Sequence, residues 1–241
     1  MDTLDLPLVE RREVARGTMS FAFDLEGRSF PFRPGQFIYV TQPAPLYHDE
    51  KGNRRHFSIA SSPRERRLLI ATRMRGSAFK HSLAEVPLGT RLEIRGPAGS
   101  FTLHANIRKP AILIAGGIGI TPFRSMVKDA TEQQLPYRLT LIYSNRAPED
   151  APFLDEFEGW AMENRHFRFV PTMTEPESTG TTWRGRTGRV DTAFLREVLA
   201  EAGGAVCYVA GPPDMARGIV QALRAAGTDD EAIRTEEFTG Y

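Results

Sequence analysis

The strongest constraint on this chain is a change in its sequence pattern near residue 106. Before that point, short segments rich in β-branched and aromatic residues alternate with glycine and proline, which is typical of a barrel or sandwich. After it, apolar strands alternate with segments of helical pattern, which is typical of a parallel, doubly wound sheet. We therefore predict a β-barrel or β-sandwich domain over residues 1–106 and an α/β domain with a doubly wound parallel sheet over residues 107–241.

The expected elements follow this division. In the first half, the expected strands are Thr18–Leu25, Gln36–Thr41, Arg55–Ala60, Arg67–Met74 and Arg91–Arg95, with a helix at Ala78–Glu85 and a turn at Gly96-Pro97. In the second half, the expected strands are Ala111–Ala115, Leu139–Tyr143, Phe167–Val170 and Val206–Ala210. The expected helices between them are Thr121–Ala130, Phe153–Met162, Thr192–Ala202 and Pro213–Ala226, while Glu175–Arg186 is expected to be a loop.

Charge and cysteine content exclude several classes of function. The 31 basic and 30 acidic residues nearly cancel, so no overall field attracts nucleic acid, and we expect no nucleic-acid partner. The single cysteine, Cys207, excludes an internal disulfide and a cysteine-based metal cluster, and we expect no metal site. The start lacks the pattern of a signal peptide, and no run approaches the roughly 18 apolar residues of a membrane span. The expectation is a cytoplasmic protein without a membrane span.

Two glycine-containing turns follow expected strands of the second half. The first, GGIGITP at 116–122, connects a strand to a helix, where glycine lets a ligand approach the backbone and the first helical amides favour a pyrophosphate. The second, YVAGPPDM at 208–215, follows a later strand. Ligands bind outside the carboxyl ends of parallel strands, so we expect both turns to face one crevice. An ordinary tight turn is the alternative for either motif alone.

A compact group in the first half combines a cation, an aromatic ring and a hydroxyl. In Arg55-His56-Phe57-Ser58, arginine can pair with phosphate oxygens, phenylalanine can stack on a flat ring and serine can donate to a ring nitrogen. A flavin nucleotide presents all three partners. The alternative is an ordinary strand with Phe57 in the core and Arg55 in solvent.

Five fragments, in this order and spacing, resemble the ferredoxin–NADP reductase-like superfamily. They are Pro34-Gly35-Gln36-Phe37, Arg55-His56-Phe57-Ser58, Gly96-Pro97-Ala98-Gly99-Ser100-Phe101, GGIGITP at 116–122 and AGPPDM at 210–215. Each fragment alone is weak, but together they span nearly the whole chain. The resemblance implies a Greek-key barrel that holds a flavin and an α/β domain from which a nicotinamide dinucleotide docks.

The resemblance also implies roles for residues of the first half. Arg55 would bind a flavin phosphate, Phe57 would stack on the isoalloxazine, and Ser58 would hydrogen-bond near its reactive N5. Thr72 to Ser82 corresponds to the family's strand and short helix at the flavin phosphates. The remaining cofactor-binding candidates are His56, Thr72, Arg73, Met74, Ala78, Phe79 and Lys80. Lys80 replaces the family's usual serine, so the backbone amides of residues 78–80 are expected at the pyrophosphate. FAD is expected rather than FMN, because Gly96–Phe101 resembles FAD-containing members.

For the second half, the resemblance implies a site for the nicotinamide dinucleotide. Thr121 and Pro122 would lie near the two reacting rings. The phosphates would lie at Gly117, Ile118 and Gly119, opposite the second turn with Gly211, Pro212 and Met215. Ser144 and Arg146, after the second strand, would accept a 2′-phosphate, which slightly favours NADPH over NADH. A solvated arginine in an NADH-using enzyme is the alternative.

The end of the chain and its cysteine are treated separately. By the same resemblance, Tyr241 would correspond to the tyrosine that covers the flavin in plant-type relatives, and a frayed tail is the alternative. Glu237 is a weaker candidate for an acid near the flavin edge. Many relatives have a cysteine before the Gly-Pro pair, where this chain has Ala210, so Cys207 is expected to be a buried strand residue.

Together these features predict an FAD-dependent NAD(P)H oxidoreductase, with Ser58, Thr121 and Tyr241 as the catalytic candidates. A hydride would pass from the nicotinamide to the flavin, and electrons would then pass to a separate acceptor such as a ferredoxin, a flavodoxin or an oxygenase component. One alternative is a reductase of free flavin or ferric chelates. Another is a regulatory or electron-transfer subunit of a larger complex. Arg64, Arg66, Arg67, Arg73 and Arg75 form a candidate basic patch for an acidic carrier protein.

Overall fold

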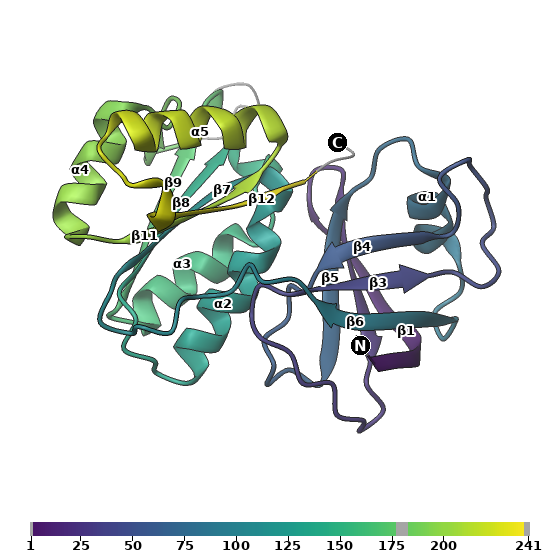
Figure 1. Ribbon diagram of the computed structural model, residues 1–241. Helices are drawn as coiled ribbons and strands as arrows, with labels where there is room; N and C mark the ends of the chain where they lie inside the picture. Colours follow the sequence, from purple (N-terminus) through teal and green to yellow (C-terminus); the bar gives the residue numbers. More distant parts are fainter. Residues whose placement is uncertain (1, 177–182, 239–241) are drawn as a thin grey trace.

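The computed structural model describes residues 2–176 and 183–238. They form an antiparallel barrel and a parallel sheet covered by helices, side by side (Figure 1). The predicted fold class is therefore confirmed. The change from one sheet to the other lies between β6 (Arg91–Ala98) and β7 (Ala111–Gly116), and the exact domain boundary at residue 106 stays a prediction.

The barrel sheet has the strand order β4-β3-β6-β1-β2-β5, with antiparallel neighbours throughout. Besides β6, its strands are β1 (Asp2–Ala15), β2 (Thr18–Asp24), β3 (Phe37–Thr41), β4 (Arg54–Ser58) and β5 (Arg67–Arg73). The long strand β1 pairs with β6 through its first half and with β2 through its second half. Alternating apolar residues such as Leu6, Leu8, Phe21 and Phe23 fill the interior.

The helix α1 (Ala78–Glu85) closes one part of the barrel and has the predicted bounds. The Ser77 side chain caps its start by accepting a hydrogen bond from the Lys80 amide. Phe79 and Leu83 are buried in the barrel core. The start of α1 is therefore fixed beside the two edge strands, β4 and β5.

The second sheet has the order β10-β9-β8-β7-β11-β12 and is parallel throughout. Its other strands are β8 (Leu139–Asn145), β9 (Phe167–Met173), β10 (Arg186–Thr187), β11 (Val206–Gly211) and β12 (Ile233–Glu237). The helices are α2 (Thr121–Glu132), α3 (Leu154–Glu163), α4 (Thr192–Ala202) and α5 (Pro213–Ala225), with short 3-10 turns η1 (Gly117–Ile120), η2 (Pro148–Asp150) and η4 (Asp230–Ala232).

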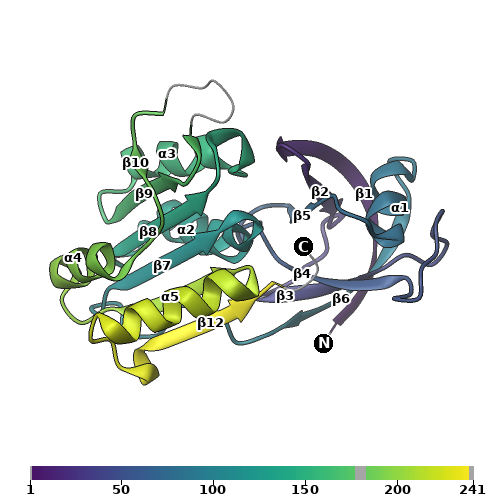
Figure 2. The same cartoon turned by 90° about the horizontal axis from the view of Figure 1, so that it is seen from above.

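Helices cover both faces of the parallel sheet, α2 and α3 on one side and α4 and α5 on the other (Figures 1 and 2). Every residue of the central strands β7 and β11 is buried, which explains their continuous apolar sequences. The carboxyl ends of these strands point toward the barrel, so the loops that follow them lie at the junction of the two domains (Figure 2).

Two buried contacts from α2 join the domains. Arg124 donates to the Ala60 carbonyl at 2.7 Å, and Ser125 donates to the Ser61 carbonyl at 2.6 Å. Arg124, only 6% exposed, also forms ion pairs with Glu65 in the barrel and Glu156 in α3. The loop after β4 and helix α2 therefore form one packed unit across the interface.

Four sequence expectations differ from the structure. The turn expected at Gly96-Pro97 is instead part of β6, where the register against β3 shifts between Phe37 and Tyr39, an irregularity that accommodates proline in a sheet. The strand β10 begins at the end of the segment expected to be a loop. The strands β1 and β12 were not among the expected strands. Among the described residues, no helix is both long and apolar enough to span a membrane.

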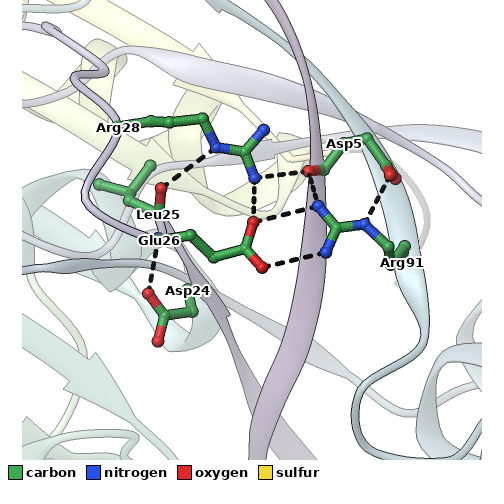
Figure 3. A network of polar contacts seen from close by, with 6 residues as sticks. All are labelled: Asp5, Asp24, Leu25, Glu26, Arg28 and Arg91. Atoms are coloured by element: carbon green, nitrogen blue, oxygen red, sulfur yellow. Dashed lines mark hydrogen bonds and ion pairs between the residues drawn. The ribbon is translucent and has the colours of Figure 1, made fainter.

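A surface network stabilises the barrel away from this junction (Figure 3). Arg91 of β6 donates to the Asp5 carboxylate at 2.6 Å and to the Glu26 carboxylate at 3.0 Å. Arg28 also pairs with Glu26 and donates to the Asp5 carbonyl at 2.8 Å. These contacts join β1, β6 and the turn after β2 at an exposed position.

Candidate active site

A cavity of about 520 Å³ lies where the barrel meets the α/β domain. It opens between the edge strands β4 and β5, beside the start of α1, the turn η1 and the end of β12. Its lining includes Arg55, His56, Phe57, Ser58, Thr72, Arg73, Lys80 and Ile118 among the predicted residues, together with Lys51, Ala71, Arg75, Gly76, Ser77, Glu236, Glu237 and Phe238. Residues from both domains therefore form one cavity.

The charges of this cavity favour an anionic ligand. Five lysine and arginine side chains line it, against two carboxylates. The pKa of Lys80 is lowered by burial first, and then by the positive charges of Arg55, Arg75 and Lys51. This mutual repulsion shows that the cations are close enough to act together on a ligand such as a pyrophosphate.

Arg55 is held in place by its own loop. Its Nη1 lies within 2.9 Å of the carbonyl oxygens of residues 51, 52 and 54, and its Nη2 lies 3.2 Å from a carboxylate oxygen of Asp49. The other Asp49 oxygen accepts from the Ala78 amide at 3.0 Å. The predicted phosphate ligands Arg55 and Ala78 are thus brought together by an acid that the sequence pattern did not single out.

The rest of the β4 motif divides between the core and the cavity. Phe57 lines the cavity but also packs in the barrel core against Phe79, with ring centroids 5.9 Å apart. The side chain of Phe79 is almost fully buried, which leaves its backbone as the part that could reach a ligand. His56 lies against the rings of Phe37 and Tyr39.

Glu236 of β12 brings a carboxyl group to Ser58. The Ser58 hydroxyl donates to Glu236 Oε2 at 3.5 Å, and burial raises the pKa of this acid to about 7 although the hydrogen bond from Ser58 lowers it. Glu237, the acid considered from the sequence, also lines the cavity but is exposed. The better-placed acid is therefore its neighbour, which can gain or lose a proton near neutral pH.

The two glycine turns meet, as the sequence suggested. A side chain on Gly119 would lie 2.3 Å from the Ala210 carbonyl oxygen, and one on Gly116 would lie 2.0 Å from the Met215 sulfur. Thr121, at the start of α2, is buried and donates to the Ile118 carbonyl at 3.1 Å, with Pro122 in the first helical turn. Glycine is required here because the carboxyl ends of β7 and β11 touch.

Arg73 connects the cavity with the first glycine turn. A side chain on Gly117 would lie 3.6 Å from Arg73 Nη2, so the guanidinium of the barrel faces the turn of the other domain. Arg73 Nε is buried without a hydrogen-bond partner among the described residues. An unpaired buried donor of a cation is costly unless an anion binds it. The residues present therefore fit a phosphate-bearing cofactor and a dinucleotide on either side of Arg73.

The segment after β8 lies at the same edge of the sheet. Ser144 is half-buried and Arg146 is exposed, at the carboxyl end of the strand next to β7. The Glu175 amide donates to the Arg146 carbonyl at 2.8 Å, so an acidic residue lies next to Arg146 along the edge. The Tyr143 hydroxyl donates to the Gly117 carbonyl oxygen at 3.2 Å, and this hydrogen bond stabilises the glycine turn.

Family comparisons decide the identity of this two-domain site. Residues 5–103 match the oxidoreductase FAD-binding domain and residues 113–221 match the oxidoreductase NAD-binding domain. Ferredoxin–NADP reductase B of Sorangium cellulosum is 32% identical over 75% of this chain and 71% of its own length. The chain belongs to the ferredoxin–NADP reductase-like superfamily. The predicted resemblance is confirmed, and the chain is an FAD-dependent NAD(P)H oxidoreductase.

Other relatives work with oxygenases. The toluate 1,2-dioxygenase electron transfer component of Pseudomonas putida is 29% identical over 86% of this chain and 59% of that protein. The propane 2-monooxygenase reductase component of Rhodococcus jostii is 28% identical over 89% of this chain and 58% of that protein. The chain thus spans little more than half the length of these two reductases.

Solved structures show the same architecture. A cytochrome P450 reductase of Amycolatopsis superposes with a TM-score of 0.83 at 25% identity, covering 99% of this chain and 70% of that one. A ferredoxin NADP+ reductase of Neisseria gonorrhoeae with bound FAD and NADP has a TM-score of 0.78 at 19% identity, covering 98% and 99%. The second likeness concerns the fold alone.

Several predicted residues lie outside the cavity, and one lies outside the described residues. Met74, Ala78, Phe79, Gly117, Gly119, Thr121, Pro122, Ser144, Arg146, Gly211, Pro212 and Met215 are not among the lining residues. Most of them adjoin the glycine turns or the edge of the parallel sheet, and their roles stay predictions. Tyr241 falls outside the described residues. Cys207 is fully buried, and burial raises the pKa of its thiol to about 12, in keeping with a strand residue.

The candidate basic patch is not a single surface. Arg73 and Arg75 line the cavity, whereas Arg67 pairs with Glu10 at 2.9 Å on the barrel exterior. The positive charge of Arg64 instead favours the ionised carboxylates of Asp129 and Glu132 in α2. Within the described residues, no group of three or more histidine, cysteine or acidic side chains is arranged to hold a metal ion.

Proposed function

We propose that this reductase takes a hydride from NAD(P)H, preferably NADPH, and passes electrons singly to a separate acceptor protein such as a ferredoxin, a flavodoxin or an oxygenase component. The observation that carries the proposal is the position of Arg73, which faces both the cavity of the barrel and the glycine turn of the α/β domain. A cation shared by two phosphate sites would bring a flavin and a nicotinamide dinucleotide to one place.

The residues of the chain would bind and orient the two nucleotides. Arg55, Lys80 and the amides at the start of α1 would hold the FAD pyrophosphate, after exchange of the Asp49 contacts. Phe57 would support the ring system, and Ser58 would donate a hydrogen bond at its edge. When bound, FAD supplies two-electron uptake and one-electron release.

The α/β domain would orient the nicotinamide. Thr121 and Pro122 begin α2 directly after the glycine turn, and Met215 fills the space beside Gly116. Glu236 would hold or release a proton at its carboxyl oxygen beside Ser58. The contacts that join α2 to the barrel would hold the start of α2 in place beside the barrel. A role for Tyr241 over the flavin remains part of the proposal.

The proposed preference for NADPH depends on Arg146 and is limited by Glu175. Arg146→Gln is expected to lower the ratio of kcat/KM for NADPH to that for NADH by about tenfold, because one charged hydrogen bond to the 2′-phosphate is lost. Glu175→Gln is expected to raise the ratio, because an acid beside the phosphate repels it. Steady-state kinetics with both donors measure this. Arg196→Gln, on α4, is the control. An unchanged ratio in Arg146→Gln would show that Arg146 does not bind the 2′-phosphate.

The proposal is tested by an anaerobic visible spectrum of the flavin-loaded protein during titration with NADPH and then NADH. Loss of the flavin band with either donor is the expected result. A reconstituted flavoprotein that neither donor bleaches would contradict the proposal and favour a regulatory subunit.

The acceptor is tested separately. With a ferredoxin as acceptor, turnover should fall steeply as salt rises, because protein docking between opposite charges is screened. Turnover with free FMN or a ferric chelate should change little. Activity only with the small acceptors would favour the free-flavin or ferric-chelate reductase. The likeness to reductase components of oxygenases makes a separate acceptor component the preferred partner class.

A further inference from the structure

A further connection between the domains lies at the β1–β2 turn. Arg16 donates to both carboxylate oxygens of Asp150, with Nε to Oδ1 at 3.0 Å and Nη2 to Oδ2 at 2.9 Å. The Arg16 amide donates to the Glu149 carbonyl at 2.7 Å. Figure 2 shows the end of the β1–β2 hairpin turned toward the α/β domain. Arg16 of the barrel thus binds the short turn η2 through both its side chain and its backbone amide.

Both residues of this contact are close to segments of the candidate site. On the barrel side, Gly17 accepts from the Met74 amide at 2.8 Å, and Thr18 lies opposite Arg73 in the β2–β5 ladder. On the α/β side, Asp150 belongs to the segment that follows Arg146 after β8. The turn therefore links the strand that carries Arg73 to the loop proposed to hold the adenosine end of the dinucleotide.

The geometry makes this pair a good determinant of domain position. Asp150 is largely buried, at 8% side-chain exposure, and the two parallel bonds of a guanidinium and a carboxylate fix orientation as well as distance. The contacts of Arg124 and Ser125 attach α2 to a different barrel segment, the loop after β4. Two attachments on different elements restrict rotation of one domain against the other more than either does alone.

We propose that Arg16 and Asp150 are a positioning pair that sets the approach of the first glycine turn to the cavity of the barrel. This inference rests on the proposed hydride transfer. Hydride transfer requires reacting atoms at about 3–3.5 Å, and a displacement of about 1 Å can cost a factor of about 100 in rate. A small relaxation of the domain angle would therefore reduce the transfer rate without removing a ligand contact.

The test is rapid-mixing measurement of anaerobic flavin reduction at saturating nucleotide. Arg16→Gln and Asp150→Asn are each expected to lower the reduction rate between about 10-fold and 100-fold. The affinity of the protein for FAD, read from flavin fluorescence, should stay unchanged because neither residue lines the cavity. The exchanged pair, Arg16→Asp with Asp150→Arg, should recover part of the rate.

Arg67→Gln provides the matched control. Arg67 forms an exposed ion pair with Glu10 at 2.9 Å, and both partners lie within the barrel. Its loss should leave the reduction rate unchanged.

The outcomes separate this inference from the proposed function. If the wild-type flavoprotein is reduced and Arg16→Gln is reduced equally fast, the positioning role is wrong. If the wild type is not reduced by NADPH or NADH, the proposed function itself fails. Because the Arg16 side chain is 58% exposed, Arg16→Gln should keep the fold, and circular dichroism checks this.

Discussion

Burial determines the protonation of Glu236, the acid next to Ser58. Its pKa of about 7 lies well above the usual 4.5, because loss of solvent outweighs the hydrogen bond from Ser58. In the folded protein the proton is therefore held more tightly than in the unfolded chain. The stability that this proton contributes is complete below about pH 4.5 and is lost as pH rises through about 7.

Glu236→Gln should remove this pH dependence in the flavin-free protein. The variant should match the wild type near pH 4.5 and become more stable than it above about pH 8, by up to about 3 kcal/mol. Denaturant unfolding across this pH range measures the difference. Glu237→Gln is the control, because Glu237 is the neighbouring acid in the same strand and is exposed. A constant difference at all pH values would mean that Glu236 titrates normally.

Single residues were predictable where a short pattern carries the chemistry. Arg55, Phe57 and Ser58 were identified from one strand, and all three line the cavity. Asp49 and Glu236 were not identified, because their partners lie in other segments: Asp49 meets the start of α1, and Glu236 meets β4 from the other end of the chain. Contacts between distant segments are not visible in a local pattern.

At the scale of elements, the glycine turn η1 depends on the close approach of β7 and β11. The position of Gly119 against the Ala210 carbonyl leaves no room for a methyl group. The obstacle is backbone, which cannot rotate away as a side chain can. The turn therefore tolerates substitution far less well than a helix surface does.

Gly119→Ala should destabilise the protein by about 2–3 kcal/mol, because the two strand ends must separate. It should also weaken binding of the nicotinamide dinucleotide. Gly218→Ala is the contrasting change, because no atom lies within 4 Å of the added methyl group in α5. That variant should gain about 0.5–1 kcal/mol from helix propensity. Thermal unfolding of both variants measures this, and a stable Gly119→Ala would show that the turn can relax.

The elements were predicted unequally well. The helix α1 and the buried strands β7 and β11 have sequence patterns that match their environments. The strand β12 was missed because its sequence, IRTEE, is mostly charged or polar. It forms an edge strand beside β11, so its backbone pairing rather than apolar burial determines its structure.

At the scale of the whole molecule, the two domains share a buried charge. Arg124 is paired with Glu65 of the barrel and Glu156 of α3, and its guanidinium lies over the rings of Phe153 and Trp160. This position couples the stability of one domain to that of the other. The change in sequence pattern indicated two domains, but the pattern within each half contained no information on their relative position.

Arg124→Gln should uncouple the domains. Removing one partner from a buried ion pair costs about 3 kcal/mol, and part of the loss falls on the contacts with Ala60 and Glu65 that cross the interface. Calorimetry should therefore show two separated unfolding transitions in the variant and one in the wild type. Arg168→Gln is the control, because its exposed pair with Glu201 lies within the α/β domain. A single transition in Arg124→Gln would place the coupling elsewhere in the interface.

The return of β12 to the barrel has a consequence for synthesis of the protein. Ribosomes make the barrel strands first, and domains generally fold in that order. Yet Ser58 meets its carboxyl partner only when residues 233–237, which are made after the whole barrel, have paired with β11. Until this pairing is made, a nascent barrel lacks the acid beside Ser58. The complete site, with the acid beside Ser58, therefore forms only once β12 of the second domain is in place.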